Sequence, residues 1–163
     1  MSADDVSMRI FIDWVYARNR LGSTPDVFDK WISTKLIKSW ILGCHLRAPM
    51  FQNDLMRNLH ARGCHGLCMP AVDFAVRNLD NGPIPADSML YRFLVRLIAY
   101  YLSTDYLGED RRKEVLRKLN TDNAYEIIMC FVGHITYTEQ GNKPEGNFPG
   151  NIFGSVDEFL VKE

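Results

Sequence analysis

Residues 24–44 read TPDVFDKWISTKLIKSWILGC, and their apolar side chains recur every three or four positions. This spacing places the apolar side chains on one face of an α-helix. Thr24 can cap the helix, and Pro25 fits its first turn, where the missing N–H of proline is not needed. Trp40 and Leu42 widen the apolar surface beyond a single stripe, which is typical of a helix with neighbours on two sides. The sequence therefore predicts one long helix at the centre of the core.

The same apolar period continues on both sides of this segment. A first helix is expected to end near Ala17, and two later helices are expected to begin around Pro49 and Pro70. Ser88 can cap the helix that follows. Apolar positions at helical spacing predict the remaining helices within residues 90–101, 115–119 and 125–135. We therefore expect an all-α single domain of six or seven helices over residues 1–137, with no β-sheet.

The last segment, residues 138–163, has a different composition. Glycines and prolines alternate there with polar residues, a pattern that cannot sustain a helix. The spacing of Ser155 and Glu158 fits a capping box, so a last helical turn can begin there. The candidate partner-binding residues of this flexible or docking tail are Phe148, Phe153, Phe159 and Leu160. They can anchor the tail on another protein, or they can fold back onto the helices of the same chain.

Composition and charge exclude several classes of partner. Nineteen basic and twenty acidic side chains give a net charge of -1, which provides no overall field for nucleic acid. The most apolar run, Phe93–Leu102, is interrupted by Arg96 and is shorter than the roughly 20 residues of a membrane span. The acidic start, Met1–Asp5, is unlike a secretory signal, and four cysteines are too few for a disulfide scaffold. We expect an intracellular protein, nuclear or cytoplasmic, without a direct nucleic-acid or membrane partner.

The sequence carries none of the common motifs for catalysis. The chain has no Gly-x-Ser-x-Gly elbow, no phosphate-binding loop and no dinucleotide fingerprint. Carboxylates such as Asp13 and Asp54 fall on predicted polar helix faces, where a solvated charge is far commoner than a general acid or base. The sequence therefore predicts neither catalytic residues nor a cofactor.

One cluster carries metal-binding side chains: His60, Cys64, His65 and Cys68. Thiolate and imidazole are the preferred ligands of zinc, so a small zinc-stabilised binding domain is the alternative interpretation of this chain. Zinc motifs usually pair two short ligand hairpins, however, and only Cys130 and His134, one helical turn apart, follow downstream. We therefore favour incidental Cys and His at a helix end, and predict no metal site.

Several short motifs carry a family resemblance. They are Phe11-Ile12-Asp13-Trp14-Val15-Tyr16, Leu36-Ile37-Lys38 through Leu42-Gly43, Leu46-Arg47-Ala48-Pro49, Phe51-Gln52-Asn53, Val76-Arg77-Asn78 and Leu90 to Ala99. In this order the motifs resemble the C-terminal helical half and helical extension of a BTB (POZ) domain of the kind abundant in filamentous fungi. The resemblance covers roughly residues 8–102, and its Ala-Pro and Phe-x-Asn elements are its specific parts.

The resemblance implies a role in protein association. A complete BTB domain begins with strands that form much of its dimer interface, and residues before Met8 do not supply them. The apolar surface on Phe11, Trp14, Phe28 and Trp31 is then expected to be covered by the later helices or by another chain. In the wider family such surfaces self-associate or recruit ubiquitin-ligase scaffolds or transcriptional regulators. We expect a non-catalytic adaptor or scaffold that forms homo- or hetero-oligomers.

Overall fold

The computed structural model describes residues 5–21, 26–29, 31–64, 69–79, 82–85, 87–103, 108–119, 121–139 and 155–162. Within these residues the chain forms seven α-helices, two short 3-10 helices and no strand, so the all-α prediction is confirmed there. The elements are α1 (Asp5–Leu21), η1 (Asp26–Phe28), α2 (Ser33–His45), α3 (Pro49–Cys64), α4 (Met69–Leu79), α5 (Met89–Ser103), α6 (Glu109–Lys118), α7 (Thr121–Glu139) and η2 (Val156–Phe159).

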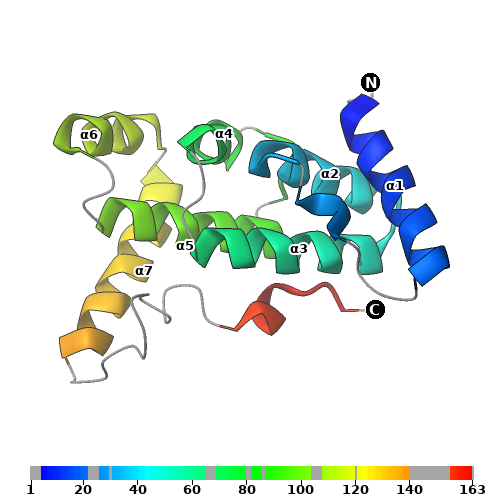
Figure 1. Cartoon of the computed structure of the whole chain (residues 1–163). Coiled ribbons are helices and arrows are strands. Elements are labelled where there is room, and N and C mark those ends of the chain that lie inside the picture. The colour runs from blue at the N-terminus through cyan, green and yellow to red at the C-terminus, as the bar shows by residue number, and fades with distance from the viewer. Residues whose placement is uncertain are drawn as a thin grey trace.

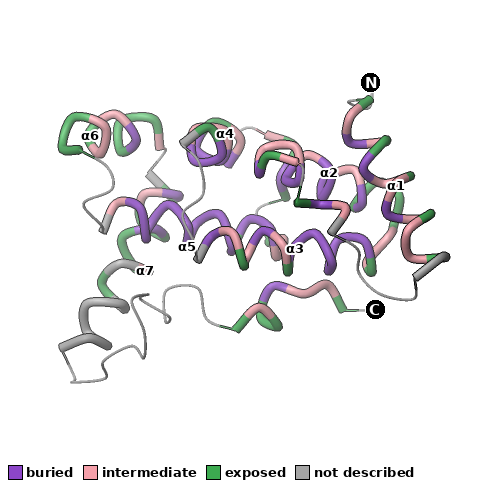
Figure 2. The backbone as a smooth tube through the Cα atoms, viewed as in Figure 1, coloured by how far each residue is buried: buried purple, intermediate pink, exposed green. Residues whose placement is uncertain are grey.

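Helix α5 is the centre of the core. It packs against α3, α4, α7 and η2, and Figure 2 shows it buried along almost its whole length. Its buried residues are Leu90, Tyr91, Phe93, Leu94, Val95, Leu97, Ile98, Ala99, Tyr100 and Tyr101. In Figure 1, α3 and α5 run lengthwise through the molecule, with α1 at one end and α6 and α7 at the other. Helix α2, in the segment predicted to be central, packs against α1, α3 and α4, so it is a second central element of the core.

The single long helix predicted over residues 24–44 is broken. A 3-10 turn ends at Phe28, Ile32 is extended with φ -70° and ψ 150°, and α2 begins only at Ser33. The guanidinium of Arg62 explains the break, because it donates hydrogen bonds to the carbonyls of Phe28 (2.6 Å) and Trp31. In a continuous helix these carbonyls would accept the amides four residues later. The proposed cap residues, Thr24 and Pro25, lie outside the described residues.

Other helix boundaries follow the local signals in the sequence. The Tyr91 N–H donates to Ser88 Oγ at 3.1 Å, which confirms Ser88 as a cap of α5. Pro49 is the first residue of α3, and Pro70 lies in the first turn of α4. Ser155 caps η2 by accepting the Asp157 N–H at 3.3 Å. Proline and capping residues act locally, so their effect was predictable from sequence.

The turn between α2 and α3 forces one residue into a left-handed conformation. The Ala48 N–H donates to the Gly43 carbonyl at 3.0 Å, and the Arg47 N–H donates to the Cys44 carbonyl at 3.2 Å. This pair of bonds is the Schellman ending of a helix, whose left-handed residue is usually glycine. Here that residue is Arg47, with φ 52°. A Cβ on Gly43 would lie 2.8 Å from Gln52 Cγ, so the missing side chain allows α2 and α3 to approach closely.

We predict that Arg47→Gly stabilises the fold by about 0.5–1 kcal/mol, because glycine adopts a positive φ without the steric cost of a Cβ. Arg47→Ala is the matched control, since alanine removes the side chain but keeps the Cβ, and it should give no gain. The measurement is the free energy of unfolding from urea titration followed by circular dichroism. An equal gain from both variants would show that the Arg47 side chain, and not its backbone, is unfavourable.

Asp54 lies in the core, contrary to its predicted place on a solvated helix face. Its side chain is only 4% exposed. It accepts hydrogen bonds from the Trp14 indole N–H at 2.9 Å, from Arg57 at 3.0 Å and from Arg18 at 3.3 Å. A buried carboxylate is tolerated only when it is paired and hydrogen-bonded, and these three donors meet that need. Asp54 thereby joins α1 to α3.

Replacing Asp54 with alanine should lower the free energy of unfolding by about 2 kcal/mol, because the Trp14 N–H would remain buried without an acceptor. Asp29→Ala provides a matched control, since the Asp29 side chain is 66% exposed and lies 3.9 Å from Arg62. That variant should cause no measurable change. Equal losses from the two variants, measured by urea unfolding, would contradict a special role for the buried carboxylate.

Candidate functional site

Helix α7 presents a row of exposed apolar side chains. Asn123 and Ile127 face the core and are buried, whereas the outer face is open. The exposed row consists of Tyr125 (64% exposed), Ile128 (50%), Met129 (51%) and Val132 (48%). Their spacing of three, one and three residues places all four on one side of the helix. We call this row the α7 stripe.

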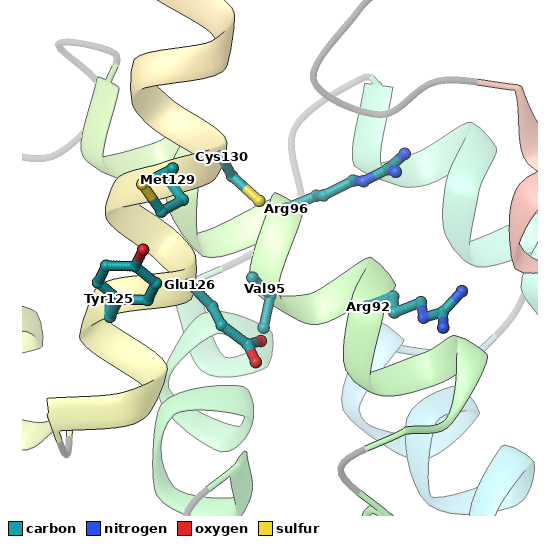
Figure 3. A pocket seen from close by; sticks show the side chains of 7 residues that line it. All are labelled: Arg92, Val95, Arg96, Tyr125, Glu126, Met129 and Cys130. Atoms are coloured by element: carbon teal, nitrogen blue, oxygen red, sulfur yellow. The ribbon is translucent and has the colours of Figure 1, made fainter.

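A shallow groove borders the α7 stripe where α7 meets α5. Its volume is about 270 Å³. Its lining residues are Arg92, Val95 and Arg96 of α5, and Tyr125, Glu126, Met129 and Cys130 of α7 (Figure 3). Figure 3 shows Arg92 and Arg96 extending away from α7, while the Glu126 carboxylate lies between the two helices. Arg92 and Glu126 are both exposed, so this face carries charges of both signs beside apolar side chains.

Cys130 is the nucleophilic side chain in this groove. Burial raises the pKa of its thiol, while the positive charge of Arg96 acts in the opposite direction. A reactive cysteine needs a lowered pKa so that the thiolate forms near neutral pH. Cys130 therefore lacks the electrostatic environment of an activated nucleophile, and it serves here as a half-buried apolar contact.

The C-terminal segment, residues 155–162, packs onto α3 and α5 (Figure 1). The ring of Phe159 is 1% exposed and meets Phe93 edge-on, with centroids 5.6 Å apart. Its centroid also lies 6.0 Å from that of His60, and the Arg96 guanidinium lies over the ring at 4.9 Å. Leu160 is partly buried against the core. Phe159 and Leu160 therefore fold back onto the helices of their own chain, which is the second of the two arrangements expected for the tail.

Polar contacts fix the same segment. Asn53 donates through Nδ2 to the Val161 carbonyl at 3.0 Å and accepts the Val161 N–H at 2.6 Å. Arg96 forms an ion pair with Glu158 at 2.8 Å, and this hydrogen bond lowers the pKa of the Glu158 carboxyl. The segment is therefore held through its backbone by α3 and through its side chains by α5. Sequence reasoning missed Asn53 and Arg96, because their partners lie 108 and 62 residues away.

The other site residues predicted from the sequence are the two remaining aromatic residues of the tail and the candidate zinc ligands. Phe148 and Phe153 lie outside the described residues, as do His65, Cys68 and the side chain of Cys64. Of the proposed zinc cluster, only the His60 side chain is described, and its ring lies near those of Phe93 and Phe159. Among the described residues no group of three or more metal-binding side chains occurs.

The described parts of the chain define an all-helical domain with an exposed apolar row on α7 and a C-terminal segment docked on its core. No protein-family model matches the chain, and neither a curated protein nor a solved structure matches it. No described helix is long and apolar enough to cross a membrane.

We predict that iodoacetamide modifies Cys44 faster than Cys130 near neutral pH, because Cys44 is exposed whereas burial raises the pKa of Cys130. Raising the pH should increase the rate at Cys130, since more of its thiol becomes thiolate. Mass spectrometry of the digested protein measures both sites, and the urea-unfolded chain, in which the two rates should converge, is the control. Faster labelling of Cys130 in the folded protein would contradict the assigned environment.

Proposed function

We propose that this chain is a non-catalytic protein-interaction module, an adaptor or scaffold, that self-associates through the α7 stripe. The observation that carries the proposal is the row of four apolar side chains, each about half exposed or more, along one face of a helix. Removing apolar surface from water favours its burial by about 25 cal/mol of free energy per Å². Contiguous exposed apolar rows of this kind are typical of interaction sites, whereas single exposed apolar residues are not.

The charges beside the stripe favour a second copy as the partner. Arg92 and Glu126 lie on the same face, line the same groove and are both exposed. In a two-fold dimer the same patch meets itself, so each charge must find its opposite within that patch. Pairing of Glu126 with Arg92 of the second copy satisfies this condition. Complementary charges of this kind fix the register of an interface whose apolar row contributes most of the free energy of association.

The position of the stripe suits an adaptor. It lies at the α6–α7 end of the molecule, opposite α1 (Figure 1). Self-association there leaves α1 accessible, and α1 carries the exposed side chains Ile12 and Tyr16, one helical turn apart. The resemblance of residues 8–102 to BTB proteins remains a prediction, and it supports the same class of function, since members of that family associate with themselves and with other proteins.

The test is Ile128→Glu, which places a charge in the middle of the α7 stripe while keeping a good helix former. If the stripe mediates association, this variant should shift the chain toward monomer by roughly tenfold in dissociation constant, since a charge buried without a partner at an interface is costly. Sedimentation velocity over a range of concentrations measures the shift, with circular dichroism to confirm that helix content is unchanged.

Ile12→Glu is the matched control. Ile12 is a 45% exposed isoleucine on a helix at the opposite end of the molecule. It should leave association unchanged. A wild-type chain that remains monomeric at every concentration, or an equal effect of the two substitutions, would refute self-association through α7.

A further inference from the structure

The C-terminal segment occupies a site with the features of peptide recognition. We call this the acceptor site and define it by Asn53 and His60 of α3 and by Phe93 and Arg96 of α5. Each of these residues contacts residues 158–161 by a hydrogen bond, an ion pair or a ring contact. The acceptor site is distinct from the α7 stripe, so the inference below goes beyond self-association through α7.

Asn53 recognises backbone. Its side-chain amide has an NH₂ group that donates and a carbonyl oxygen that accepts in the same plane, and they bind the Val161 carbonyl and N–H respectively. Asn53 is itself buried, so the loss of this pair of bonds would leave polar atoms without partners in the core. Leu160, just before Val161, is extended, with φ -83° and ψ 139°. The contact depends on extended backbone and not on the identity of the side chain at position 161.

Two side chains of the segment provide specificity. The Phe159 ring fills the space between His60 and Phe93, where a smaller apolar side chain would leave a void. Arg96 contacts the segment twice, through the ion pair with Glu158 and by lying over the Phe159 ring. The acceptor site therefore fits an acidic residue followed directly by phenylalanine and by an extended apolar pair.

We propose that the acceptor site binds a segment of this pattern from a partner protein, and that the C-terminal segment of the chain is its built-in competitor. The docked segment is short, and its flanking residues Ser155, Asp157 and Lys162 are exposed. Fifteen residues, 140–154, connect it to the end of α7. The segment belongs to the same chain as the acceptor site and competes as an intramolecular ligand, so a partner segment must bind more tightly or be presented at a second contact to displace it.

The experiment measures binding of a fluorescent peptide, SVDEFLVKE, which copies residues 155–163, to the full-length chain and its variants. Phe159→Ala in the chain removes the anchor of the competing segment. The peptide should then bind roughly tenfold more tightly to this variant than to wild type, because the tethered competitor is weakened. The peptide should also raise the melting temperature of the variant, since a ligand that binds only the folded state stabilises that state. A peptide in which the phenylalanine is replaced by alanine should do neither.

A second variant keeps the test valid if Phe159→Ala folds poorly. Glu158→Ala changes an exposed side chain and removes the ion pair with Arg96, so peptide affinity should again increase, by a few-fold. Lys162→Ala is the matched control, because Lys162 is an exposed residue of the same segment outside the recognised pattern. It should leave the affinity for the peptide unchanged. Adding Asn53→Ala to either variant should abolish binding, since the backbone contact is lost.

The proposal would be overturned if the peptide bound neither the Phe159→Ala chain nor the Glu158→Ala chain. The proposal would also be overturned if the wild-type chain formed a dimer that Phe159→Ala abolished while the free peptide did not bind. Two copies would then exchange their C-terminal segments, and no outside partner would be needed. Peptide anisotropy reports the acceptor site, and sedimentation of Ile128→Glu reports the α7 stripe. The failure of one proposal is therefore distinguishable from the failure of the other.

Discussion

The arrangement of the molecule depends on one constraint, the need to enclose α5. Ten of its fifteen residues are buried apolar side chains, and its exposed side is a narrow strip that carries Arg92 and Arg96. A helix with so wide an apolar surface must be surrounded by other elements on most of its sides. Helices α3, α4 and α7 cover most of α5, and the C-terminal segment covers Phe93 through the ring of Phe159. The return of the chain terminus to the core is thus explained by the apolar surface that α5 would otherwise expose.

Helix α3 joins both ends of the chain to this core through two adjacent polar residues. Asp54 binds Trp14 and Arg18 of α1, whereas Asn53 binds the backbone of Val161. Burying polar groups is unfavourable unless each finds a partner, so these bonds specify where the two ends lie rather than simply adding stability. Apolar contacts alone would permit several registers of α1 and of the C-terminal segment on α3.

The sequence predicted those features that depend on neighbouring residues. The 3.6-residue period gave the helices, and Ser88 and Pro49 marked helix starts correctly, because capping and proline geometry act over a few positions. The break at Ile32 was not predictable, because Arg62 produces it from another helix. The α7 stripe was visible as an apolar pattern, yet its exposure was not, since periodicity identifies an apolar face without showing what covers it.

Arg96 links the two surfaces physically. It lines the groove beside the α7 stripe, and it also holds Glu158 and Phe159 in the acceptor site. Its side chain extends from the groove away from α7, and its guanidinium contacts Glu158 and Phe159 (Figure 3). A ligand in the groove that displaces the Arg96 side chain also moves this guanidinium, and the resulting change in binding free energy must be equal in both directions. Exchange of the C-terminal segment and association through α7 are therefore expected to influence each other through this side chain, without any larger rearrangement of the helices.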